Sequence, residues 1–421
     1  MDNLVWKPAS SLAFGLLCWS NAASAQETSA YFDRSSVVPV SEQSNPAYDA
    51  KPILIGNFVV QPEALFSAGQ SSNVLASPYD EIEDTYVGFA PKVAIASDWQ
   101  RHAVGALIDV DHREFQDLSD ESRTNVKLKL RGRLDFGKST SLTLDLAAAD
   151  LNEERSALSA LPTALEPNEY TQTEAGLTFK HEAGRFAFET GAALSQFDYD
   201  DAELQDDLFL DQDFRDRDEF TGTARVALAF DPSLAVYSQV QYVLADYAPA
   251  GFFNPFNRDY DGVVALVGTD FAFGRRVSGD IAVGYQYYSY DDPSFEEISD
   301  VAFVGNLDVM LARRTSLSAS AERKVIDPGQ LLTNAAIETG GQVRLEHGLT
   351  QKLSLSGEAG IAQYAFETIE RDDDRVDLKL GANWKINPSI WLEGGYEVID
   401  QTSDVQEFTD NRMLLRMRIF P

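Results

Sequence analysis

From Pro52 to Phe420, apolar and polar side chains alternate along the chain with a period of two residues. The clearest case is the stretch NVKLKLRGRLDF, Asn125 to Phe136, in which four cations occupy every second position and most positions between them are aliphatic. On a helix this pattern would scatter the cations around the whole cylinder, whereas on a strand it places them in one row on one face. The pattern therefore predicts a β-strand with one polar and one apolar face.

The alternating segments are long. About eighteen of them, of roughly 11–17 residues each, follow one another, whereas strands of soluble proteins usually have about five or six residues. Crossing a bilayer at a tilt of about 40° takes about nine to eleven residues, and more where a strand extends beyond it. Past the N-terminal region no apolar run reaches about 18 residues, and a chain that spans a membrane without such helices must form a closed barrel. A soluble β-sandwich is the alternative, but it would not need strands of this length.

Short turns and long polar loops alternate between these segments. The short turns recur at intervals of about 37–49 residues, the hairpin repeat of an up-and-down barrel. Long loops fall between them, as at Arg155–Asn168 and Asp200–Asp213. In outer-membrane barrels short turns are periplasmic and long loops extracellular, so we expect both chain ends in the periplasm. The predicted fold is all-β: a transmembrane antiparallel up-and-down barrel of about eighteen strands over residues 52–421.

Aromatic residues cluster near the short turns, as in the belts that barrels carry at the membrane interface. The predicted girdle consists of Phe136, Phe179, Phe186, Phe230, Phe273, Trp384 and, on the opposite parity, Trp391.

Cations in the alternating segments are expected to face the lumen, because a charge facing lipid at mid-bilayer costs about 2–4 kcal/mol. The first and last strands must pair to close the barrel, which would bring the cationic rows of distant segments together as a basic sector on one side of the lumen. The predicted sector consists of Lys127, Lys129, Arg131, Arg133, Arg375, Lys379, Arg412, Arg416 and Arg418. Candidate sugar-contacting residues in the lumen are Tyr237, Gln239, Gln241, Gln286 and Tyr288. Each of these five is equally well explained as an ordinary polar lumen residue.

The N-terminus has the pattern of a secretory signal peptide, residues 1–25. An apolar region runs from Leu12 to Trp19, and Ala23 to Ala25 form a cleavage site; a short membrane anchor is the alternative. Cys18 is the only cysteine and lies inside this signal, so disulfides and thiolate metal sites are not expected in the mature chain. Residues 26–51 have few large aliphatics and no periodicity, which predicts a flexible periplasmic segment. It would serve either to dock a periplasmic polysaccharide export protein or as a spacer.

The formal net charge of −33 disfavours binding to nucleic acid. The acids concentrate in the long loops, which predicts a solvated acidic collar on the extracellular side. Within it, the spacing of Asp211, Asp213, Asp216 and Asp218 lacks the core of an EF-hand loop, and no metal site is predicted. Catalytic motifs and cofactor fingerprints are not found in the sequence. His112 lies near Asp109 and Asp111, but a histidine beside acids on a wet strand is ordinary, so neither an enzyme nor a cofactor is expected.

The stretch FVVQPEALFSAGQSSNV, Phe58 to Val74, resembles the opening of the putative β-barrel porin 2 family of Gram-negative outer-membrane proteins. The resemblance consists of an apolar pair, Pro62 within a strand, the Leu65-Phe66 pair and Asn73 before an apolar residue. It implies a pore associated with exopolysaccharide or capsule secretion, and it supplies no catalytic residues.

One feature departs from outer-membrane barrels in general. Their last strand usually ends on an aromatic residue that faces lipid, but here Pro421 follows Phe420, and Phe420 shares the parity of the arginines. A bulge near the end, or an atypical insertion signal, is needed to explain this.

Location in the outer membrane and a role as the exit conduit for a secreted polysaccharide are therefore the leading expectations. A general diffusion porin and a structural or adhesive barrel are the alternatives. Eighteen tilted strands give a backbone diameter of roughly 35 Å, which suits any of these functions. The expected partners are outer-membrane lipid, lipopolysaccharide and the polysaccharide itself.

Overall fold

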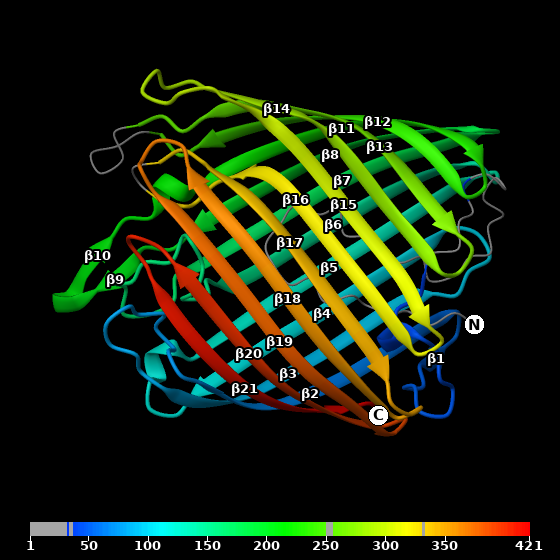
Figure 1. The fold of residues 1–421 in the computed structure, drawn as a ribbon, viewed down its shortest axis with the longest axis horizontal. Helices are drawn as coiled ribbons and strands as arrows, with labels where there is room; N and C mark the ends of the chain where they lie inside the picture. The colour runs from blue at the N-terminus through cyan, green and yellow to red at the C-terminus, as the bar shows by residue number, and fades with distance from the viewer. Residues whose placement is uncertain (1–31, 33–36, 250–255, 331–332) are drawn as a thin grey trace.

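The computed structural model describes Phe32 and residues 37–249, 256–330 and 333–421. In these ranges the chain forms one large antiparallel sheet that closes on itself as a barrel (Figure 1). No helix in the described ranges is long and apolar enough to cross a membrane. The predicted signal peptide and its cleavage site lie outside the described residues.

The barrel wall contains eighteen strands in the described chain, since the sheet has 19 strands and the three-residue β1 (Ile53–Ile55) only flanks it. The wall strands are β2 (Phe58–Ser71), β3 (Asp84–Ser97), β4 (Ala103–Phe115), β5 (Arg123–Phe136), β6 (Thr140–Asn152), β7 (Glu169–Ala183), β8 (Phe186–Tyr199), β11 (Arg217–Asp231), β12 (Leu234–Tyr247), β13 (Tyr260–Phe273), β14 (Val277–Tyr290), β15 (Ile298–Ala312), β16 (Thr315–Ile326), β17 (Ala336–Gly348), β18 (Leu353–Phe366), β19 (Asp372–Asn387), β20 (Ile390–Thr402) and β21 (Phe408–Ile419). They have 12 to 16 residues, enough to cross a bilayer when tilted. The predicted fold class is confirmed.

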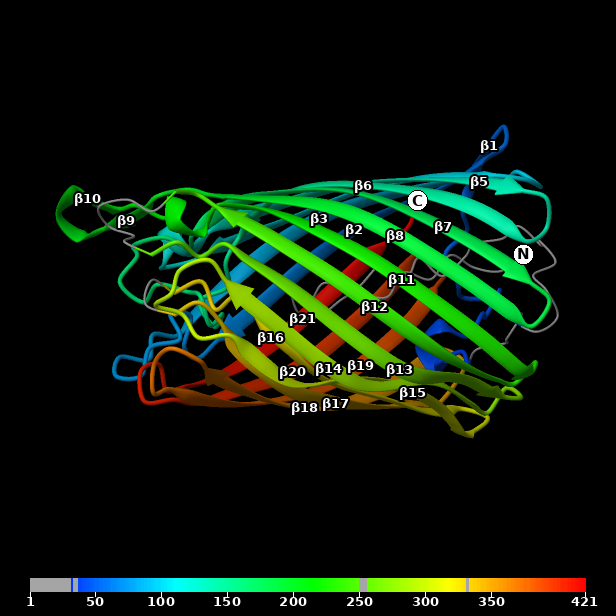
Figure 2. The same ribbon diagram turned by 90° about the horizontal axis from the view of Figure 1, so that it is seen from above.

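The two ends of the barrel carry different connections. Tight turns such as 137–139 and 184–185 join the strands at one end, and Gly137 and Gly184 adopt φ values of 74° and 61° that favour glycine. Long loops join them at the other end, where loop 200–216 extends as the short strands β9 (Ala202–Leu204) and β10 (Leu208–Leu210). The C-terminus and β1 lie at the short-turn end, opposite β9 and β10 (Figures 1 and 2).

Alternation along β5 has the predicted consequence for its apolar face. Val126, Leu128, Leu130 and Leu134 are all exposed on the outer surface, and Phe136 at the short-turn end of the strand is 53% exposed. Exposed apolar residues in such a row suit contact with lipid.

The predicted aromatic girdle is present near the short turns, with one exception. Phe186, Phe230, Phe273 and Trp384 are exposed there, like Phe136, and Phe179 is half-buried on the same face. Trp391, on the opposite parity, faces the lumen, where its indole N–H donates to the carbonyl of Tyr48 at 3.0 Å.

The barrel closes between its first and last strands. β2 and β21 pair antiparallel from Ala64 opposite Ile419 to Ser71 opposite Arg412. Closer to the short-turn end, β1 pairs with the first residues of β2. Pro62 lies in the part of β2 that has no partner on β21, which is where a residue without an N–H is tolerated.

Asn73 ties the extracellular end of this seam. Its side-chain amide donates to the carbonyls of Ser77 at 2.9 Å and Thr409 at 3.3 Å, and its side-chain oxygen accepts from the N–H of Ser77. Its own N–H donates to the carboxylate of Asp410, which also accepts from the hydroxyl of Ser71. Asn73 and Asp410 are both 0% exposed. The asparagine noted in the sequence therefore joins the loop after β2 to the last strand.

Phe420 remains on the lumen side. β21 pairs with β20 up to Ile419 without a bulge. The ring of Phe420 packs edge-on against Trp391, with centroids 4.8 Å apart. The bulge that would turn this aromatic residue toward lipid is absent from these two fully described strands.

Replacing Asn73 by Ala should weaken closure. The change removes the hydrogen bonds that the Asn73 side chain makes with the backbone of Ser77 and Thr409, each contributing about 0.5–1.5 kcal/mol net. The folded barrel should then unfold at a lower temperature in an electrophoretic heat-modifiability assay. Asn306→Ala is the matched control, since the side chain of Asn306 is exposed in the lumen. An unchanged transition in Asn73→Ala would contradict this role of the seam.

Candidate functional site

The cations of β5 line the inner surface of the barrel. The aliphatic row of the strand is on the outer surface, and neighbouring residues on a strand point to opposite faces. Arg131 pairs with Asp145 of β6 at 2.5 Å, and Arg133 pairs with Asp135 at 2.8 Å. The part of the row nearest the short turns is thus neutralised by carboxylates of β5 itself and of the adjacent β6.

Lys127 and Lys129 continue this row toward the long loops. Lys127 stands opposite Asp109 of β4. That carboxylate binds Lys92 of β3 at 3.6 Å. No ion pair or hydrogen bond engages the ammonium group of Lys127 within the described ranges. Lys127 is therefore available to an anion in the lumen.

Ion pairs cross the seam and link this row to β21. Arg418 binds Glu63 of β2 at 2.8 Å and Glu393 of β20 at 2.8 Å. With the Lys92–Asp109 pair, charges of opposite sign follow one another from β20 to β4. A confined charge without a partner is costly, and this alternation supplies the partners. The predicted basic sector thus contains carboxylates between its cations.

The remaining predicted cations lie on the same inner sector. Three pair with carboxylates: Arg375 with Asp377 at 3.0 Å, Lys379 with Glu397 at 3.0 Å and Arg412 with Asp410 at 2.5 Å. Arg416 lies opposite Glu393 in the strand register but forms no ion pair in the part of the chain that the structure describes. Among the predicted cations, Lys127 and Arg416 have no carboxylate partner in that part of the chain.

The opposite wall, β7 to β18, carries mainly acids on its inner face. Among them are Glu174, Glu189, Asp270, Asp280, Asp308, Glu322, Glu338, Glu346 and Glu358. Fewer cations interrupt them, among them Arg225, which pairs with Asp280 at 3.2 Å. The lumen is thus polarised from side to side.

The candidate sugar contacts divide into two groups. Gln239 and Gln241 are half-buried on the inner face of β12. Tyr237, Gln286 and Tyr288 are 4%, 1% and 7% exposed. The hydroxyl of Tyr237 donates to Asp280, and its ring occupies the place that a Cβ at Gly268 would take. In this arrangement the three buried side chains offer almost no surface to a solute.

Loop 153–168 reaches across the outer mouth. It joins β6 to β7, yet the carbonyl of Ser156 accepts from Arg375 of β19 at 2.7 Å, on the far side of the barrel. The carbonyl of Leu158 accepts from Gln330 at 3.0 Å, in the loop after β16. The loop therefore contacts the far side of the barrel instead of extending into solvent.

Ion pairs anchor two consecutive residues at the start of this loop. Glu154 binds Arg123 at 2.7 Å and Arg113 at 3.5 Å. Arg155 binds Glu121 at 2.6 Å. Desolvation alone would raise the pKa of Glu154, but the guanidinium groups of Arg123 and Arg113 outweigh it and lower that pKa to about 2.

Buried arginines in the acidic loops were not anticipated from the sequence. Arg155, Arg215 and Arg258 are 6%, 2% and 1% exposed. Arg215 pairs with Glu153, and Arg258 pairs with Asp327. Arg155 and Arg215 lie among acids in the sequence, which is a signal that could have indicated them, whereas loop 248–259 around Arg258 contains a single acid, Asp259. The predicted acidic collar is thus partly an internally paired layer.

The N-terminal segment lies against the inner wall at the periplasmic end. The N–H groups of Val37 and Val40 donate to the hydroxyls of Ser278 and Ser316, on β14 and β16. Further along, Asp49 pairs with Lys385 of β19 at 2.7 Å. Residues 37–50 thus hold a defined position inside the barrel, which the absence of periodicity gave no reason to expect.

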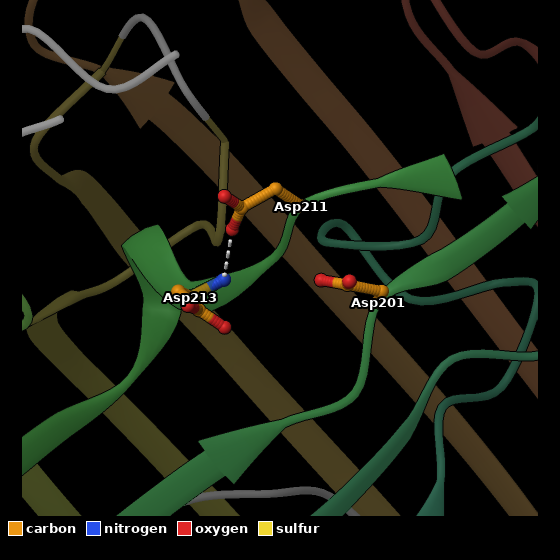
Figure 3. Close-up of side chains that lie close together, drawn as sticks. All are labelled: Asp201, Asp211 and Asp213. Carbon is orange, nitrogen blue, oxygen red and sulfur yellow. Dashed lines mark hydrogen bonds between the residues drawn. The ribbon is translucent and has the colours of Figure 1, made fainter. Parts of the chain in front are cut away.

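One group of acids lies close together in loop 200–216. The carboxylates of Asp201, Asp211 and Asp213 approach within 4.8 Å of one another at the base of β9 and β10 (Figure 3). All three are exposed, and Asp216 is turned away because its carboxylate accepts the N–H of Tyr199 at 2.7 Å. Exposed acids in such a loop are ordinary, and we assign no metal to them.

The fold and the lumen together define a class. A closed barrel with a lipid-facing apolar surface, an aromatic girdle, long loops at one end and a charged interior is an outer-membrane pore. The chain matches the model of the family described as "Putative beta-barrel porin 2" over residues 45–419, and it belongs to that family. The protein is thus an outer-membrane porin rather than an enzyme, as the sequence predicted.

A comparison with solved structures finds similar chains at low sequence identity. The outer membrane protein OpdK of Pseudomonas aeruginosa is 12% identical, with 86% of this chain and 99% of that chain covered and a TM-score of 0.44. A BenF-like porin of Pseudomonas fluorescens Pf-5 is 11% identical, with 86% and 99% covered and a TM-score of 0.44. OpdL of Pseudomonas aeruginosa is 13% identical, with 87% and 99% covered and a TM-score of 0.44. A search of curated proteins finds no match. Likeness at this level says nothing about what the pore carries.

Replacing Glu154 by Gln should loosen loop 153–168 and raise single-channel conductance in planar bilayers, because the neutral amide holds Arg123 and Arg113 less strongly. Glu166→Gln, in the same loop but exposed, is the control and should leave conductance unchanged. Equal conductance in both variants would contradict the anchoring role.

Acid should have the same effect on the unmodified protein. The pKa of Glu154 is lower in the folded loop than its ordinary value of 4.5, so the stabilisation is complete above about pH 4.5 and is lost as pH falls toward 2. Conductance should therefore rise between these values, and Glu154→Gln should lack that part of the pH dependence. A rise confined to higher pH would point to another group.

Proposed function

We propose that this porin carries a secreted anionic polysaccharide, an exopolysaccharide or capsule polymer, from the periplasm to the cell surface. The observation that carries the proposal is the cationic row of β5, which together with β21 gives one side of the lumen a series of ammonium and guanidinium groups along the strands. A polymer with regularly spaced carboxylates would meet successive cations as it advances. The opposite, acidic wall would hold it on the basic side.

Paired charges suit transit better than unpaired ones would. Most of the cations already have a carboxylate neighbour, so a polymer carboxylate exchanges one partner for another and gains little net free energy. Weak contacts repeated along the lumen allow the polymer to be released at each step. Lys127 and Arg416, which have no such neighbour within the described chain, would provide the strongest contacts.

A general diffusion porin is the second candidate, and the polarised lumen favours it, because opposite charged walls also orient small polar solutes. The position of loop 153–168 across the outer mouth favours the first candidate, since a pore open at rest for small solutes does not need an anchored cover. A structural or adhesive barrel is the third candidate.

The proposed partners follow from the two ends of the barrel. Acids of the long loops would meet lipopolysaccharide through divalent cations. At the periplasmic end, the N-terminal segment would either contact a periplasmic polysaccharide export protein or serve as a spacer. The polymer itself would enter past this segment.

Deleting the gene should abolish surface polysaccharide while leaving the uptake of small nutrients unchanged. Cell-surface polymer would be measured by staining and by composition, and uptake with labelled solutes. Slower uptake with intact polysaccharide would instead favour the diffusion porin.

The double variant Lys127→Gln/Arg416→Gln should slow export without preventing assembly, because neither removal leaves a carboxylate unpaired. Exposed charge contacts are worth about 0.2–1 kcal/mol each, so export should fall about two- to thirtyfold. In planar bilayers, the reversal potential in a salt gradient should shift toward cation selectivity. Lys324→Gln, on the acidic wall, is the control; it breaks ion pairs with Glu322 and Glu338, and export should still be unchanged. Export equal to that of the unmodified protein would remove these two residues from the path.

A further inference from the structure

A carboxylate-binding pocket lies at the extracellular end of the lumen, and an aspartate of the protein occupies it. Asp327, the first residue after β16, accepts from the guanidinium of Arg258 at 2.5 Å and from the hydroxyl of Tyr247 at 3.0 Å. Arg217, at the start of β11, approaches the same carboxylate at 3.6 Å. Two guanidinium groups and a phenol thus converge on one carboxylate from three different segments.

The pocket is nearly closed to solvent and is not fully used. Arg258 is 1% exposed and Tyr247 is 6% exposed. Asp327 accepts a hydrogen bond from only one nitrogen of Arg258, Nη2. The Nε–H of the same guanidinium is buried without a hydrogen-bond partner in the described chain. A guanidinium can bind a carboxylate through two parallel hydrogen bonds. Arg258 therefore retains a donor that a differently placed carboxylate could use.

The electrostatics of the pocket favour an anion strongly. Desolvation would raise the pKa of the Asp327 carboxyl, but Arg258 and Arg217 outweigh it and hold that pKa far below its ordinary value of 3.8. If the aspartate left, the buried Arg258 would remain without a charge partner and Arg217 would keep only Glu219, which is costly. An arriving anion would restore the balance.

Aromatic rings border the pocket on one side. The Arg258 guanidinium lies 4.9 Å from the centroid of the Tyr247 ring. Tyr260 follows at 6.4 Å from Tyr247, and Tyr290 follows at 5.6 Å from Tyr260. A hexuronate is a sugar ring with apolar C–H faces that carries one carboxylate. The tyrosine rings could contact the sugar faces while the arginines bind the carboxylate.

We propose that Arg217, Arg258 and Tyr247 form a subsite for the carboxylate of a hexuronate unit, and that Asp327 holds this subsite when no polymer is present. The inference rests on the proposed function and names its substrate class. Exchange of one carboxylate for another leaves the charge of the pocket unchanged, so binding is weak and reversible. Such an exchange gives selectivity for acidic sugars at the exit without trapping the polymer.

The direct test removes the internal competitor. Asp327→Asn keeps the size of the side chain but not its charge. The probe is a short oligomer of galacturonic acid added to single channels in planar bilayers, with a neutral maltodextrin of equal length for comparison. Current blocks by the acidic oligomer should last about tenfold longer in Asp327→Asn, equivalent to about 1.4 kcal/mol. Blocks by the neutral oligomer should not change.

Two control variants separate the subsite from a general effect. Asp404→Asn removes an exposed acid from the same mouth and should leave both kinds of block unchanged. Adding Arg258→Gln to Asp327→Asn should remove the gain. Equal lengthening for acidic and neutral oligomers would mean only a looser mouth and would overturn the proposal, as would no lengthening at all.

A second variant covers the case in which Asp327→Asn does not assemble. Arg258→Lys keeps a cation beside Asp327 but removes the Nε–H donor that Asp327 does not use, so acidic blocks should shorten in this variant while neutral blocks stay the same. Acidic blocks of unchanged duration would refute the subsite. These bilayer measurements do not depend on export in cells, so loss of the subsite with normal export, or the reverse, would distinguish failure of this inference from failure of the proposed function.

Discussion

Closure of the sheet is the constraint on which the rest of this molecule depends. In a bilayer every backbone N–H and C=O must be paired, and an open sheet edge has no water to satisfy it. The ladder between β2 and β21 meets this demand over the upper part of the seam, and Asn73 and Asp410 extend it into the loops. The curvature of the wall, the enclosed lumen and the position of both cationic rows all follow from that one junction.

Enclosure then decides how charge is arranged. Side chains on the inner face cannot reach bulk water as freely as those on a soluble protein, and so the basic side of this lumen is built from opposite charges in sequence rather than from one sign. Arg418 is an example, because its single guanidinium pairs with carboxylates from both neighbouring strands. The same rule operates in the loops, where Arg155, Arg215 and Arg258 each meet a carboxylate from a different loop or strand end.

Sequence alone was sufficient for features that depend on local periodicity. The alternation in β5 predicted that this segment is a strand, which of its faces meets lipid, and that it is long enough to cross the bilayer. The opposite parity of Trp384 and Trp391 likewise separated a ring that faces outward from one that faces the lumen. Contacts between distant segments carry no such signal. Nothing in the sequence connects Glu153 with Arg215 or Asp327 with Arg258, because those pairs depend on how loops cross the mouth. Likewise, the polar side chains that hold residues 37–50 are spread over strands from β14 to β20. No pattern within the segment itself therefore predicts that it lies against the inner wall.

The placement of that N-terminal segment has a mechanical consequence. Its bonds to the wall are side-chain contacts with scattered residues rather than a strand ladder, and each hydrogen bond of this kind contributes only about 0.5–1.5 kcal/mol net. Backbone pairing of the barrel does not pass through it. Pulling on the segment from the periplasm would therefore detach it contact by contact, while the eighteen wall strands would resist as one cooperative unit.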